Sequence, residues 1–123
     1  MNEAPGGAAG QAAVRSLLLG ERAATRARLA ALERDFDGIV SSSQFAATDD
    51  EHDPDGGTTA FDRQHVAALI GQARERLADI GTAIERLDAG SYGYCERCGD
   101  AIGAERLAAR PAARRCISCA AAT

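Results

Sequence analysis

Cys95-Glu-Arg-Cys98 is followed, after seventeen residues, by Cys116-Ile-Ser-Cys119, and these are the only cysteines of the chain. A Cys-x-x-Cys turn lets two thiolates reach one ion, and two such turns at this spacing are typical of a tetrahedral zinc site. Two disulfides or a redox-active pair are the alternatives that the spacing leaves open. Because four cysteine ligands leave no position for water, we expect one structural Zn²⁺ and no catalytic metal.

The residues around the cysteines fit a small metal-binding module over residues 90–119. Gly99 directly follows Cys98, where a turn needs a residue that tolerates a positive φ. Ile102, Leu107 and Ile117 are expected to cover the site and exclude water. One brief helix near residues 103–109 is the regular structure expected here, and residues 120–123 are expected to form a short tail.

Residues 59–89 have the clearest helical pattern. Apolar residues repeat there at alternating intervals of four and three, which is the heptad pattern of coiled-coil packing. The positions are Val66, Ile70, Ala73, Leu77, Ile80, Ile84 and Leu87. Gly90 is the expected end of this helix.

A second helix is expected over residues 11–40, with its own apolar seam. The seam contains Leu18, Thr25, Leu29, Leu32, Phe36 and Ile39, and Arg22 occupies the remaining position. Two helices of similar length joined by one loop predict an antiparallel hairpin within a single chain. The alternative is a heptad dimer between two chains, and we expect a monomer.

The predicted organisation is therefore mainly α. A flexible tail (1–10) precedes an antiparallel coiled-coil arm (11–89) with an acidic loop at its tip (41–58). Pro54, Gly56 and Gly57 disfavour helix in this loop, and Thr58 or Thr59 is expected to cap the helix that begins after it. A four-cysteine zinc finger (90–119) completes the fold.

Composition narrows the function and the compartment. The formal net charge is −4, which disfavours sequence-independent DNA binding through phosphate neutralisation. The amino terminus lacks the basic and apolar regions of a signal peptide, and no apolar run is long enough to span a membrane. We expect a cytoplasmic protein, where cysteine pairs are more often metal ligands than disulfides.

One run of sequence, Leu87-Asp-Ala-Gly-Ser-Tyr-Gly-Tyr-Cys-Glu-Arg-Cys-Gly-Asp-Ala-Ile102, carries a family resemblance. It is followed by Glu105-Arg-Leu-Ala-Ala-Arg-Pro111 and the second cysteine pair. This chain resembles the DksA/TraR family of bacterial transcription regulators. The resemblance implies a non-enzymatic protein that binds RNA polymerase and inserts its coiled-coil tip into the secondary channel, with a zinc module at the base. Some family members act with ppGpp, which makes ppGpp a candidate partner.

The family tip commonly carries Asp-x-x-Asp-x-Ala, and this chain departs from that pattern. Asp50 and Asp53 have the family spacing, but Asp55 stands where Ala is expected. Counting back from Cys95 without gaps aligns His52 and Asp55 instead. The candidate tip residues are therefore Asp50, His52, Asp53 and Asp55. A solvated loop, a probe directed at a basic channel or bound Mg²⁺, and direct cation binding remain open readings.

Four arginines make the zinc module locally basic and are a candidate partner-contact surface: Arg106, Arg110, Arg114 and Arg115. A solvated face is the alternative. Tyr92 and Tyr94 are expected to pack at the junction of arm and module, with base stacking as the alternative. The family resemblance therefore implies a transcription regulator that binds RNA polymerase, and no sequence-specific DNA binding is expected. The rival function is a zinc-finger DNA-binding or scaffold protein that lacks the tip activity.

Overall fold

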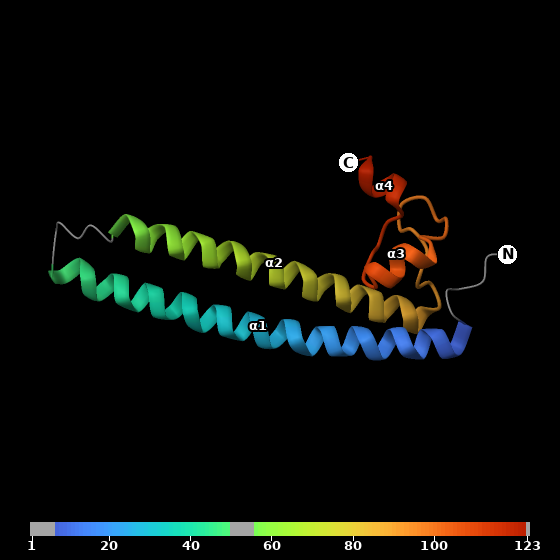
Figure 1. Cartoon of the computed structure of the whole chain (residues 1–123), viewed down its shortest axis with the longest axis horizontal. Helices are drawn as coiled ribbons and strands as arrows, with labels where there is room; N and C mark the ends of the chain where they lie inside the picture. The colour runs from blue at the N-terminus through green and yellow to red at the C-terminus, as the bar shows by residue number, and fades with distance from the viewer. Residues whose placement is uncertain (1–6, 50–55, 123) are drawn as a thin grey trace. The chain divides into compact units, whose positions relative to one another are not determined.

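The computed structural model describes residues 7–49 and 56–122, with side chains described for 10–41 and 60–122. Four helices follow one another along the chain: α1 (Gly7–Asp49), α2 (Gly56–Ala89), α3 (Ala104–Ala109) and α4 (Ile117–Ala121) (Figure 1). The described residues contain no strand, only an isolated antiparallel bridge between Tyr94 and Ala101. The predicted fold class, a helical hairpin with a small four-cysteine module, is confirmed.

The chain divides into two compact units, and each contains part of both long helices. One unit ends its first stretch at Ala23 and resumes at Leu77, and it includes the zinc module. The other unit is Ala24–Arg76. Within each unit, a stretch of α1 runs antiparallel to a stretch of α2 (Figure 1). The heptad pattern is therefore satisfied inside one chain in both units.

Both long helices extend beyond the expected boundaries. α1 begins at Gly7 and continues through Ser41 to Asp49, and α2 begins at Gly56. Serine is only about 0.5 kcal/mol less favourable than alanine in a helix, and adding a residue to an existing helix avoids the cost of nucleation. The expected loop at 41–58 therefore contains helix at both ends, and the expected caps Thr58 and Thr59 lie inside α2.

The predicted apolar seams supply the interior of both units. In the unit with the zinc module, Leu18 and Ile80 are completely buried. In the other unit, Thr25, Ile70 and Ala73 occupy the seam at 8%, 9% and 5% exposure. Small side chains at two of these positions leave a groove of about 350 Å³, lined by Ala24, Thr25, Arg28, Leu69, Gln72, Ala73 and Arg76.

The end of α2 confirms the role predicted for Gly90. Its φ is 79°, which is the left-handed region that favours glycine. The Gly90 N–H donates to the Leu87 carbonyl at 3.3 Å, and the Ser91 N–H donates to the Arg86 carbonyl at 2.9 Å. This pair of bonds is a Schellman motif, which satisfies the last carbonyls of α2 and directs the chain into the zinc module.

None of the helices in the described part of the chain is long and apolar enough to cross a membrane.

Candidate metal centre

The four cysteine sulfurs converge on one point. Their Sγ atoms all lie within 4.8 Å of one another, and the Sγ atoms of Cys98 and Cys116 are 3.8 Å apart. A tetrahedral zinc with Zn–S distances of about 2.3 Å places its sulfurs roughly 3.8 Å apart. All four cysteines are free, and a disulfide requires about 2.05 Å between sulfurs. The geometry therefore fits zinc and does not fit the disulfide alternative.

The first cysteine pair lies in a tight turn built by Gly99. The φ of Gly99 is 80°, as its place after Cys98 predicted. Its N–H donates to the Cys95 carbonyl at 2.9 Å, and the Cys95 N–H donates to the Asp100 carbonyl at 2.7 Å. These bonds hold both thiols on one side of the turn.

The second pair is held by α4, which the sequence reasoning missed. Cys116 is the N-cap of this helix, and its sulfur accepts a hydrogen bond of 3.4 Å from the Cys119 N–H. Residues three apart share one helix face, so Cys116 and Cys119 point the same way. The signal in the sequence was the alanine run after Cys119, which was interpreted as a tail.

Hydrogen bonding gives the thiols different acidities. The Cys98 backbone N–H donates to the sulfur of Cys95, which lowers the pKa of Cys95 to about 6. The hydrogen bond with the Cys116 thiol raises the pKa of Cys119 to about 12. Zinc binding removes these differences in protonation, because zinc binds all four sulfurs as thiolates and releases their protons.

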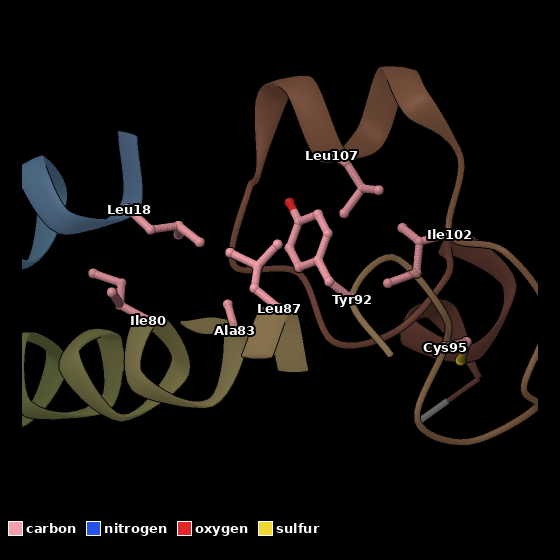
Figure 2. Packing of buried hydrophobic residues seen from close by; sticks show 8 residues of the cluster. All are labelled: Leu18, Ile80, Ala83, Leu87, Tyr92, Cys95, Ile102 and Leu107. Carbon is pink, nitrogen blue, oxygen red and sulfur yellow. The ribbon is translucent and has the colours of Figure 1, made fainter. Parts of the chain in front are cut away.

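Two of the three expected covering residues are correct. Ile102 and Leu107 are 6% and 5% exposed and belong to the cluster that contains Cys95 (Figure 2). Ile117 is 66% exposed, so the prediction that it covers the site is wrong. It directly follows Cys116 on α4, and consecutive helical residues point about 100° apart, so inward cysteines turn Ile117 toward solvent.

Tyr92 packs inside the module and does not face a nucleic acid. Its side chain is 2% exposed, and Figure 2 shows its ring between Leu87 and Leu107. The hydroxyl donates to the Pro111 carbonyl oxygen at 2.8 Å. Burial raises the pKa of Tyr92. Tyr94 is half-buried, and its carbonyl accepts a hydrogen bond from the Arg86 guanidinium.

Three of the four candidate contact arginines already have partners within the compact unit that contains the module. Arg114 donates to Glu96 and Asp79, both at 3.0 Å, while Arg115 donates to Glu96 at 3.3 Å. Arg106 donates to the Arg115 carbonyl at 2.9 Å. The hydrogen bond from Arg114 lowers the pKa of Glu96. Intramolecular bonds therefore engage three of the four arginines, and a role in contacting a partner stays a prediction.

Arg110 differs from the other three. It is exposed, and its side chain has no partner among the described residues. The predicted tip residues Asp50, His52, Asp53 and Asp55 lie outside the described residues, so their arrangement stays a prediction.

Comparison with known proteins identifies the metal-binding module. Residues 90–123 match the family described as the prokaryotic dksA/traR C4-type zinc finger. The module is similar to the DksA/TraR zinc finger. The predicted resemblance to this family is confirmed for residues 90–123, and with it the assignment of one structural zinc to the four clustered cysteines.

Curated relatives align with part of this chain. The RNA polymerase-binding transcription factor DksA of Haemophilus influenzae is 44% identical over 46 residues, which cover 37% of this chain and 32% of that protein. General stress protein 16O of Bacillus subtilis is 37% identical over 68 residues, or 55% and 42% of the two chains. The matched part thus spans less than half the length of these relatives.

The structural likeness extends beyond the DksA/TraR zinc finger. The structure of transcription factor DksA2 from Pseudomonas aeruginosa aligns with a TM-score of 0.75 and 28% sequence identity. The alignment covers 94% of this chain and 84% of DksA2. The hairpin is therefore part of the shared architecture.

Proposed function

We propose that this chain is a bacterial regulator of transcription that binds RNA polymerase and has no enzymatic activity of its own. The observation that carries the proposal is the likeness to transcription factor DksA2 over 94% of the chain, because it includes the hairpin as well as the zinc finger. The relative from Haemophilus influenzae is named for RNA polymerase binding. Because a fold alone does not fix a function, the proposal needs a direct binding test.

In this proposal, the segment with Asp50, His52, Asp53 and Asp55 enters the secondary channel of the polymerase. Its carboxylates then act on the basic channel wall or the bound Mg²⁺. Support comes from the acidic composition of this segment and from the family resemblance. The zinc finger is the structural base, and the protein works as a cytoplasmic monomer.

Among the four candidate arginines, Arg110 is the proposed contact residue of the zinc finger, because its side chain is exposed. Arg106 and Arg115 already donate to groups of the zinc module, and Arg114 donates to Glu96 and to Asp79 of α2, so binding a partner would cost those bonds. Arg110→Ala is expected to weaken polymerase binding without changing the helical content. Equal binding by wild type and variant would remove Arg110 from the interface.

The binding test uses the full chain with its zinc and purified bacterial RNA polymerase. We expect association in gel filtration at low salt, and altered transcript yield in vitro with and without ppGpp. Absence of association would reject the proposal. Salt-dependent retention of DNA without polymerase would favour the rival DNA-binding function, although the net charge of −4 opposes it.

The tip hypothesis has a matched control within the chain. The triple variant Asp50→Asn, Asp53→Asn, Asp55→Asn should change transcription and largely retain polymerase binding. A control with the same change of charge replaces the exposed Asp35, Asp37 and Asp62 by Asn. Equal effects of the two triple variants would show that net charge, and not the tip, is responsible.

A further inference from the structure

One network of charged groups joins α2 to both halves of the zinc site. Glu96 directly follows the ligand Cys95, while Arg114 and Arg115 directly precede Cys116. The two carboxylate oxygens of Glu96 accept separate bonds from Arg114 at 3.0 Å and Arg115 at 3.3 Å. The Glu96 N–H also donates to the Arg114 carbonyl at 2.9 Å. The two cysteine turns are thus tied together next to the sulfurs.

A single guanidinium extends this network to the helix. Arg114 uses its Nε atom for Glu96 and its Nη1 atom for Oδ1 of Asp79, each at 3.0 Å. Asp79 is half-buried on α2 and lies next to the fully buried Ile80. Arginine suits this place because its planar fork donates in two directions at once, which an ammonium group does not do with fixed geometry.

We propose that Asp79 is a positioning residue for the zinc site, acting through Arg114. Asp79 fixes the guanidinium, the guanidinium fixes Glu96, and the second cysteine turn is thereby held against the first. Outer groups of this kind orient metal ligands and raise metal affinity. By thermodynamic reciprocity, zinc binding also stabilises the part of α2 around Asp79.

The first test measures zinc affinity by competition with a chromophoric chelator, using the full chain. Asp79→Asn should lower the affinity about two- to fivefold, the range expected for one partly exposed ion pair. Asp79→Glu, which keeps the carboxylate, should retain the wild-type affinity. Asp88→Asn is the matched control, because Asp88 lies on the same helix and pairs with Arg15 at 2.7 Å. Equal affinities for Asp79→Asn and Asp88→Asn would overturn the proposal.

A double-mutant cycle tests whether Asp79 acts through Arg114. Arg114→Gln should weaken zinc binding more than Asp79→Asn, because it loses both carboxylate partners. The double variant should then bind zinc as Arg114→Gln does. Additive losses of affinity would show that Asp79 acts by another route and would reject the proposal.

Hydrogen exchange supplies a readout that needs no variant. In the wild-type chain, zinc should slow amide exchange around residues 77–82 of α2 and leave exchange around Val66 unchanged. In Asp79→Asn, the zinc-dependent slowing should be smaller. If zinc does not change exchange around Asp79 in the wild-type chain, the proposed coupling is absent, whether or not the variants fold.

Discussion

The hydroxyl of Tyr92 donates to the carbonyl oxygen of Pro111 across nineteen residues of sequence, at 2.8 Å. The bond is buried and ties the segment before the first cysteine turn to the segment before the second. Pro111 is itself buried, so its carbonyl depends on this donor for a partner within the described residues. Tyr92 is therefore a structural residue of the zinc finger.

Removing the Tyr92 hydroxyl should destabilise the fold. Tyr92→Phe keeps the ring packing but leaves the Pro111 carbonyl buried without a donor, which costs about 1–3 kcal/mol. Urea unfolding of the zinc-loaded protein measures the change in the free energy of unfolding. A loss well below this range would contradict the role assigned to the Tyr92 hydroxyl.

The acidity of Tyr92 gives a prediction at high pH. Tyr92→Phe and Tyr94→Phe each leave one of the two tyrosines of the chain, so absorbance at 295 nm reports on a single phenol. In Tyr94→Phe, Tyr92 should ionise above its ordinary pKa of about 10, because burial disfavours the phenolate.

The raised pKa of Tyr92 also sets the sign of a stability change. The folded state holds the phenol proton more tightly than the unfolded state, so the stabilisation is complete below the unfolded pKa. It is lost as pH rises through the folded value. Denaturant should return the midpoint of the titration to the ordinary value. An unshifted midpoint in the folded protein would contradict the burial of the ring.

Two adjacent leucines of α1 should respond very differently to truncation. Leu18 is 0% exposed and Leu17 is 49% exposed. Leu18→Ala should lower the free energy of unfolding by about 2–5 kcal/mol, because it removes buried carbon and leaves a cavity. Leu17→Ala should change it by less than about 1 kcal/mol. Similar losses in denaturant unfolding would mean that the seam is misassigned.

Alanine substitutions of Gly71, inside α2, and of Gly90, at its end, should change the stability of the protein in opposite directions. Gly90→Ala forces an L-residue to a φ of 79° and should destabilise the protein by about 1–2 kcal/mol. Gly71→Ala should stabilise it by roughly 0.5–1 kcal/mol, since Gly71 is exposed inside the helix and an added Cβ meets nothing within 4 Å. Thermal unfolding followed by circular dichroism measures both. A stabilising Gly90→Ala would refute the Schellman assignment.

Zinc removal should unfold the carboxy-terminal module. Metal analysis should return one zinc per chain, and a strong chelator should release it with loss of the near-ultraviolet signal of Tyr92. Zinc affinity should fall as pH falls, because protons compete for the thiolates. Cys98→Ser should lose affinity, whereas Ser118→Ala keeps all four thiols and should not. A metal-free protein with reduced thiols and a folded module would overturn the structural role of zinc.

The sequence was most informative where one residue type performs one geometric task. The heptad positions on both helices, the glycine at the end of α2 and the four cysteines each pointed to the arrangement that the structure shows. Helix ends were less predictable, since Ser41 and the residues after it neither require helix nor prevent it. The side chains around the zinc site were least predictable. Whether Arg114 faces solvent or Asp79 depends on the position of a helix far away in sequence.

The Asp79–Arg114 pair has a consequence for changes in chain length. Each residue added to a helix rotates the remainder of that helix by about 100° and moves it by about 1.5 Å. An insertion or deletion between Asp79 and Gly90 would therefore turn the Asp79 carboxylate away from the Arg114 guanidinium. The apolar residues of the seam would be rotated by the same angle. On the other side of Asp79, matched insertions of one heptad in both helices leave the pair intact. We therefore expect a change in the length of the hairpin to be tolerated only where it precedes Asp79 in α2 and is matched in α1.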